Sequence, residues 1–86
     1  MAQVRITAEA RNQFAALPIT IHARVQRILA ELAAWPHVSG VKPMRGALKG
    51  AYRKRTGDWG VLFTVDGDAD QVLVFRIANR RDVYEA

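Results

Sequence analysis

The chain has 86 residues, half of them hydrophobic, which predicts a single domain over residues 1–86 with a small core of its own. It contains no cysteine, which excludes disulfides and cysteine-based metal sites and is typical of a reducing, cytoplasmic compartment. A net charge of +5 favours polyanions or acidic proteins as partners, and the sequence has no apolar run long enough to span a membrane.

The first part of the chain is predicted to form a short strand and two helices. Val4 and Ile6 alternate with polar neighbours, as in a strand, and Thr7 is a good N-cap for a following helix. Pro18 is expected to end one helix and begin the next, and Pro36 to end the second. Apolar residues follow the helical period throughout: Ala10, Phe14, Leu17, Ile21, Val25, Ile28, Leu29, Leu32 and Trp35.

The remainder is predicted to be a meander of antiparallel strands. Gly57-Asp58 is a turn dipeptide, and the acidic segment 66–70 supplies a hairpin loop rather than a calcium site. The predicted strands are Ala51–Thr56, Trp59–Val65 and Gln71–Ala78. The expected fold class is therefore α+β: a short N-terminal strand, a two-helix hairpin packed on a small antiparallel sheet, and a short C-terminal helix or tail.

Alternation along the strands indicates which face of this sheet the helices cover. The aromatic-rich sides are expected beneath the helices: Trp59, Val61, Phe63 and Val65 on one strand, and Leu73, Phe75 and Ile77 on the next. The other face is then open to solvent and carries Gly60, Thr64 and Arg76. In the preceding strand Arg53 and Arg55 share the open face. Lys54 would point toward the helices, where its ammonium must reach an edge to stay hydrated.

Basic residues are segregated in the second half of the chain. Between positions 42 and 55 there is no acid, and the basic residues there are Lys42, Arg45, Lys49, Arg53, Lys54 and Arg55. Arg76, Arg80 and Arg81 follow, with Tyr84 close behind. Guanidinium forks bind phosphate oxygens in pairs, and an aromatic ring can stack on a base. This pattern predicts a surface that binds an RNA backbone. The alternative is a basic face that is merely solvated.

Several short motifs extend over almost the whole chain in a fixed order. They are Val4-Arg5-Ile6-Thr7-Ala8-Glu9-Ala10, Trp35-Pro36, Leu48-Lys49-Gly50, Tyr52-Arg53-Lys54-Arg55-Thr56-Gly57-Asp58-Trp59, Val61-Leu62-Phe63 and Arg80-Arg81-Asp82-Val83-Tyr84. In order and spacing, these motifs resemble the RelE/ParE superfamily, the toxins of bacterial type II toxin–antitoxin systems.

The resemblance implies a small basic toxin that inhibits translation. RelE-type relatives enter the ribosomal A site and cut mRNA by attack of a ribose 2′-hydroxyl on the neighbouring phosphorus, with no metal or other cofactor. The implied partners are a cognate antitoxin, the ribosome and mRNA, with no membrane. By position, the implied catalytic residues are Arg53, Arg55, Arg80 and Tyr84. The implied RNA-binding residues are Arg45, Lys49, Lys54, Arg76 and Arg81.

Two positions depart from the pattern of the family. Gly60 stands where relatives usually carry an arginine, and Asn79 stands where many carry a histidine. A missing guanidinium weakens stabilisation of the phosphorane, and an amide cannot accept a proton near neutral pH. Arg76, on the open face of the adjacent strand, is expected to occupy the space that Gly60 leaves.

Three functions therefore remain open on the sequence. The first is a ribosome-dependent mRNA endoribonuclease, the second a ParE-like inhibitor of DNA gyrase, and the third a catalytically degenerate protein that only binds antitoxin or RNA. The dense arginines favour the first. His22 and His37 lie away from the basic strands and are interpreted as surface residues, while Asp58 and Asp82 are interpreted as structural.

Overall fold

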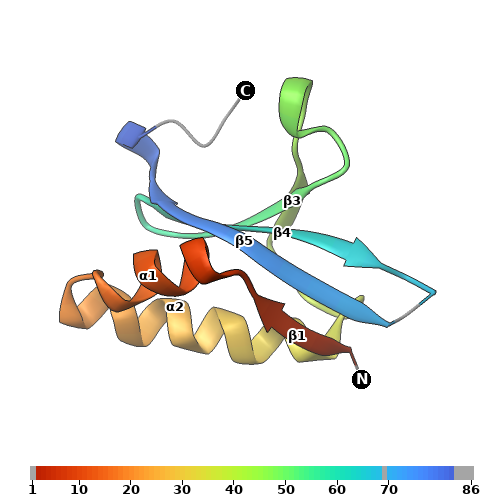
Figure 1. Cartoon of the computed structure of the whole chain (residues 1–86), viewed down its shortest axis with the longest axis horizontal. Coiled ribbons are helices and arrows are strands. Elements are labelled where there is room, and N and C mark those ends of the chain that lie inside the picture. Colours follow the sequence, from red (N-terminus) through yellow and green to blue (C-terminus); the bar gives the residue numbers. More distant parts are fainter. Residues whose placement is uncertain (1, 69, 83–86) are drawn as a thin grey trace.

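A computed structural model, which describes residues 2–68 and 70–82, has a five-stranded mixed sheet with two helices on one face (Figure 1). The strands are β1 (Gln3–Ile6), β2 (Val41–Pro43), β3 (Tyr52–Thr56), β4 (Trp59–Asp66) and β5 (Gln71–Asn79). The helices are α1 (Ala8–Ala15) and α2 (Ile19–Glu31), with 3₁₀ turns η1 (Leu32–Ala34), η2 (Gly46–Leu48) and η3 (Arg80–Asp82). The helices lie below the sheet in Figure 1, and η2 and η3 stand on the opposite side.

The helical hairpin forms as predicted. The Thr7 side chain accepts a hydrogen bond from the Ala10 N–H at 3.1 Å and so caps α1, while Pro18 is the N-cap residue of α2. The buried apolar residues of both helices, including Ala10, Val25 and Ile28, pack on the sheet with Val61, Phe63 and other strand residues in one core. Within residues 2–68 and 70–82, no helix is both long and apolar enough to cross a bilayer.

The sheet order is β1-β5-β4-β3-β2, and this order confirms the predicted α+β class. Strands β2 to β5 pair in antiparallel fashion, as the meander required. Strand β1 instead runs parallel to β5, from Gln3 opposite Gln71 to Ile6 opposite Val74. The sheet is therefore mixed, and β2 adds a short edge strand from the segment after Pro36, where no strand was predicted.

An irregularity in β5 overturns part of the predicted side-chain pattern. Leu62 pairs with Arg76 while Phe63 pairs with Val74, so Phe75 is an extra residue in β5. As a result Val72 and Val74 face the helices. The assignment of Leu73 and Phe75 to that face is wrong: Leu73 is 39% exposed, and Phe75 packs on the other side of the sheet.

The face of the sheet opposite the helices is partly covered by the chain itself. A second, smaller apolar cluster there joins the segment between β2 and β3 to the strands β4 and β5. Its members are Met44, Leu48, Ala51, Leu62, Phe75 and Ala78. Because this cluster anchors η2 on the open face, the basic residues around η2 are held near those of the strands.

Candidate nucleic-acid interface

The strand register places a row of basic side chains on the open face of the sheet. Lys42 on β2 is opposite Arg53 on β3, Arg53 is opposite Leu62 on β4, and Leu62 is opposite Arg76 on β5. Directly opposed residues point to the same side of a sheet, and Leu62 belongs to the open-face cluster. We call Lys42, Arg53 and Arg76 the basic row. Adjacent strands lie about 4.8 Å apart, so the Arg53 and Arg76 backbones are separated by about 10 Å.

A second row lies beside the first and contains Gly60. In this row Arg55 on β3 is opposite Gly60 on β4, which is opposite Ala78 on β5. Neither Gly60 nor Ala78 carries a long side chain, so no bulky side chain stands beside Arg55 in this row. Arg76 is the diagonal neighbour of Gly60, at a Cα separation of about 7–8 Å. A long side chain reaches across that distance, which fits the expectation that Arg76 replaces a guanidinium at Gly60.

Arg80 begins η3 and is tied to the turn between β3 and β4. Its backbone N–H donates to the Asp58 carbonyl at 2.7 Å, and its Nη1 lies 3.5 Å from Asp58 Oδ1. Both side chains are largely exposed, so the guanidinium remains accessible. Asn79 has a structural role here, because its Oδ1 accepts a hydrogen bond from the Arg81 N–H at 3.0 Å and shapes the start of η3.

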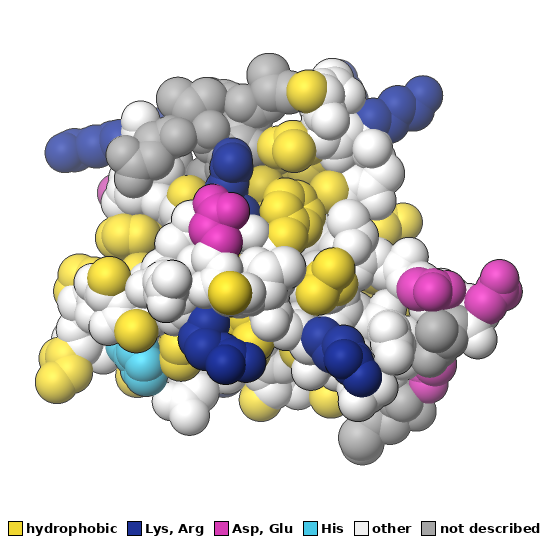
Figure 2. Space-filling model, viewed as in Figure 1, with side chains coloured by type: hydrophobic (Ala, Val, Ile, Leu, Met, Phe, Trp, Pro, Cys, Tyr) yellow, Lys and Arg dark blue, Asp and Glu magenta, His cyan; other side chains and the backbone are white. Residues whose placement is uncertain are grey.

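Arg45 and Lys49 flank η2 on the same side of the sheet as η3. Both residues are exposed, and they occupy the two cap positions of this 3₁₀ turn. In Figure 2, Lys and Arg side chains project at the upper left and upper right, and the acidic side chains at the far right belong to the region of the β4–β5 hairpin. The described basic residues of the open side are thus separated from that acidic hairpin.

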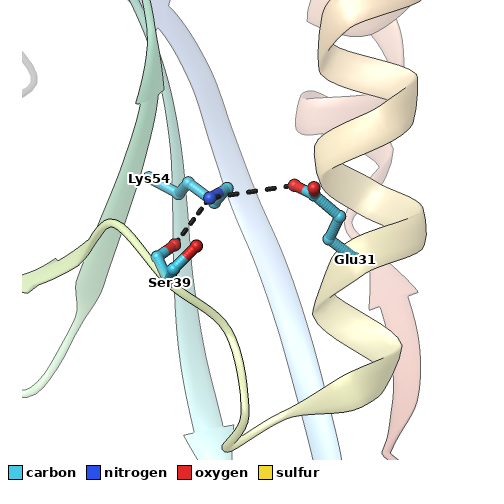
Figure 3. A network of polar contacts seen from close by, with 3 residues as sticks. All are labelled: Glu31, Ser39 and Lys54. Carbon is cyan, nitrogen blue, oxygen red and sulfur yellow. Dashed lines mark hydrogen bonds and ion pairs between the residues drawn. The ribbon is translucent and has the colours of Figure 1, made fainter.

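Lys54 does not join this surface. Its Nζ donates to the Ser39 carbonyl at 2.6 Å and lies 3.7 Å from Glu31 Oε1 of α2 (Figure 3). The side chain is only 14% exposed. The alternation that placed Lys54 toward the helices is therefore correct. Its ammonium binds groups of the helix layer and does not lie on the open side, where the predicted RNA-binding residues were expected. Lys54 is better described as a link between β3, α2 and the segment before β2.

Lys42 is the residue of this surface that sequence reasoning left without a role. It belongs to the acid-free stretch, but the short strand around it was not predicted, so its facing was unknown. The alternation of Val41, Lys42 and Pro43 is the available signal, since Val41 packs in the main core. Tyr84, the fourth implied catalytic residue, lies outside the described residues.

The two histidines lie away from the basic row. His22 stacks on Phe14 with ring centroids 4.0 Å apart, at the helix side of the molecule, and His37 is exposed before β2. Among residues 2–68 and 70–82 there is no group of three or more His, Asp or Glu side chains arranged to hold a metal ion. What the described site offers to a ligand is therefore mainly guanidinium and ammonium groups.

Comparison with known proteins identifies the family. The family described as the ParE toxin of the type II toxin–antitoxin system, parDE, matches residues 4–84. Toxin RelG of Mycobacterium tuberculosis is 33% identical over 82 residues, covering 94% of this chain and 93% of RelG. Toxin RelE of the same organism is 35% identical over 82 residues, covering 94% of this chain and 84% of that toxin.

Solved structures give the same result. The RelBE2 toxin–antitoxin complex of Mycobacterium tuberculosis contains a chain that superposes with a TM-score of 0.79 at 28% identity, over 92% of this chain and 98% of that one. The isolated RelE toxin of E. coli shares the fold, with a TM-score of 0.76 at 15% identity over 92% and 84% of the two chains. This chain belongs to the RelE/ParE superfamily of type II toxins.

Proposed function

We propose that this protein cuts messenger RNA on the ribosome as a metal-free endoribonuclease and thereby inhibits translation. The observation that carries the proposal is the basic row, in which Lys42, Arg53 and Arg76 from three strands face one side of the sheet. A ribose 2′-oxygen attacks the adjacent phosphorus, the bond to the 5′-oxygen breaks, and a 2′,3′-cyclic phosphate forms. The phosphorane gains negative charge, which cations held in place stabilise without reorganising.

The residues are assigned to roles by their position. Arg53, Arg55 and Arg80 bind the phosphate and the charge that develops on it, and Tyr84 orients or stacks on the substrate. Arg76 supplies the guanidinium that Gly60 does not. Because the Asn79 amide cannot accept a proton near neutral pH, we assign the 2′ proton to water and the protonation of the 5′-oxygen to water as well. The cleavage rate is then expected to rise with pH.

Expression without an antitoxin tests this function directly. New 5′ ends in cellular mRNA, in phase with codons, are expected within minutes of induction, and purified protein should cleave ribosome-bound mRNA with no metal ion beyond the Mg²⁺ that keeps the ribosome intact. Arg76→Ala is expected to reduce the cleavage rate by roughly 10²-fold, the usual cost of one transition-state donor. Arg24→Ala, which removes an exposed arginine on α2, is the matched control and should cleave normally.

A gyrase inhibitor is the second candidate, and the match to the ParE toxin family is the observation that favours it. The same induction separates the two. DNA breaks trapped in gyrase, with intact mRNA, would establish the second function in place of the first. Normal growth with intact mRNA and DNA would instead identify a degenerate protein that keeps only its binding partners.

We also propose that a cognate antitoxin binds this protein and that an acidic part of it covers the basic row. Relatives solved as toxin–antitoxin complexes, including RelBE2 and the E. coli RelBE complex, support the existence of such a partner. The positive field of the open face favours an acidic segment. Co-expression with the neighbouring reading frame should yield a stable complex, and Arg53→Glu should weaken it far more than Arg24→Glu.

A further inference from the structure

A pocket of about 450 Å³ lies where the outer edge of β5 continues beyond the end of β1. The backbone N–H of Ile77 has no partner in β1, because the pairing of β1 with β5 ends at Val74. The Gln13 side chain of α1 accepts its hydrogen bond through Oε1 at 2.7 Å. Helix α1 and strand β5 therefore form the two sides of the pocket. Its lining includes Glu9, Gln13, Leu17, Trp59, Arg76 and Ile77.

The charged groups of the pocket are available to a ligand. Among the residues that the structure describes, Arg76 has no ion-pair partner, although its side chain is half-buried. Glu9 lines the same pocket and receives only a 3.4 Å hydrogen bond from Gln13 Nε2. A guanidinium that lines an open pocket without a carboxylate partner presents its N–H donors to an acceptor that enters the pocket. Gln13, held by Ile77, keeps the Glu9 carboxylate at the pocket.

We propose that this pocket binds a guanine base of the RNA substrate. A guanidinium donates two parallel hydrogen bonds to guanine O6 and N7, the acceptors of one edge of the base. A carboxylate accepts from N1–H and the 2-amino group on the adjacent edge. Trp59 offers an aromatic wall, and Leu17 and Ile77 offer apolar surface on which a planar ring is desolvated. Adenine lacks this pairing of two acceptors with two donors.

The position of the pocket connects it to the proposed cleavage surface. Arg76 belongs to the basic row by register and also lines the pocket, so the two sites share a border. A nucleotide with its base in the pocket would bring its phosphate toward the basic row. The inference rests on the proposed RNA function and adds a base preference to it, but base binding is measurable without cleavage.

Titration of the full chain with nucleoside monophosphates tests the proposal. The probes are GMP, IMP and AMP, which share the ribose and phosphate and differ only in the base, so binding to the basic row alone is equal for all three. The readout is the Trp59 indole N–H resonance, identified with Trp59→Phe. We expect a saturable shift with GMP, an affinity for AMP at least tenfold weaker, and an affinity for IMP, which lacks the 2-amino group, roughly tenfold weaker than for GMP.

Two variants assign the contacts. Glu9→Gln should abolish the preference for GMP over IMP, and Arg76→Ala should weaken GMP and IMP together. Glu31→Gln and Arg11→Ala change residues that do not line the pocket, and they should retain the GMP/IMP ratio. The proposal is overturned by the absence of a saturable shift, by equal affinity for GMP and AMP, or by a GMP/IMP ratio that Glu9→Gln leaves unchanged. Selective GMP binding by a protein that cleaves no mRNA would refute the proposed function and keep the pocket.

Discussion

Arg80 and Asp58 are connected twice, through the backbone at 2.7 Å and through their side chains at 3.5 Å. The backbone contact fixes where η3 leaves the sheet, whereas the ion pair is exposed and competes with any phosphate that approaches the guanidinium. The two contacts therefore have opposite consequences for a phosphate ligand. One positions Arg80 at the site, and the other must open for the guanidinium to bind bidentately.

The first prediction concerns this ion pair. Asp58→Asn is expected to strengthen RNA binding several-fold, because the competing carboxylate is lost while the backbone hydrogen bond is kept. The free energy of unfolding should change by less than about 1 kcal/mol, since both groups are exposed. Fluorescence anisotropy with a short single-stranded RNA measures the affinity. Asp68→Asn, on the exposed β4–β5 hairpin, controls for the change in net charge. Weaker RNA binding by Asp58→Asn alone would contradict the competition.

The second prediction compares two lysines on adjacent strands, Lys42 on β2 and Lys54 on β3, whose side chains lie on opposite faces of the sheet. Lys42→Ala is expected to lower the dependence of RNA affinity on salt, with a slope smaller by about 0.7, and to leave stability almost unchanged. Lys54→Ala should leave the salt dependence unchanged and lower the free energy of unfolding, because Lys54 binds Ser39 and Glu31 and does not lie on the open face. Salt titrations of RNA binding and urea unfolding of both variants test this pair. Equal slopes for the two variants would disprove the assigned facing.

The size of the Lys54 effect follows from its two contacts. The hydrogen bond to the Ser39 carbonyl is short, whereas Glu31, the partner of Lys54 in the ion pair, is 46% exposed and contributes less. We expect Lys54→Ala to lower the free energy of unfolding by about 1–2 kcal/mol. Glu31→Gln should lower it by less than half as much, and a larger loss would show that the ion pair dominates.

The third prediction concerns the link between α1 and β5. Gln13→Leu removes the acceptor of the Ile77 N–H and should lower the free energy of unfolding by about 1–3 kcal/mol, the cost of an unsatisfied, partly buried donor. Gln13→Glu keeps an acceptor of similar length and should retain most of the stability. Asn12→Leu, at an exposed position of the same helix, is the control. Faster hydrogen exchange at Ile77 in Gln13→Leu, but not in Gln13→Glu, is the local signature.

A fourth prediction tests the main core. Phe63 is fully buried and packs against Trp35 and Tyr52, with ring centroids 5.5 Å and 5.8 Å away. Phe63→Ala should cost about 3–5 kcal/mol, which is a large fraction of the stability of a domain of this size. Phe63→Leu should cost much less and retain a cooperative transition. Calorimetry distinguishes the two, and a mild effect of Phe63→Ala would mean that the aromatic group is not the centre of the core.

The helices and most strands were predictable because each follows one simple period. Thr7 and Pro18 mark helix starts by local chemistry, and both act as predicted. The facing of β5 was not predictable, because the extra residue Phe75 breaks the period of two and leaves a sequence that reads as regular alternation.

The candidate site was predictable in its charge and less so in its geometry. Arg53 and Arg55 share a face because they alternate within one strand, which needs no tertiary information. Lys42 and the pocket at Gln13 depend on contacts between segments distant in sequence, and single-sequence patterns do not contain them. The structural role of Asn79 likewise became clear only from its contact with the Arg81 N–H.

The position of β5 in the sheet has a consequence for synthesis of the toxin. This strand is the last of the described strands to be synthesised, yet it lies between β1 and β4 and carries Arg76. Until β5 is synthesised, β1 has no neighbouring strand, and the backbone N–H and C=O groups of β1 and β4 that pair with β5 remain hydrated. We therefore expect a fragment ending at Asp70 to show no cooperative unfolding transition. We expect the same fragment, which lacks Arg76 and Arg80, to be harmless when it is expressed in cells.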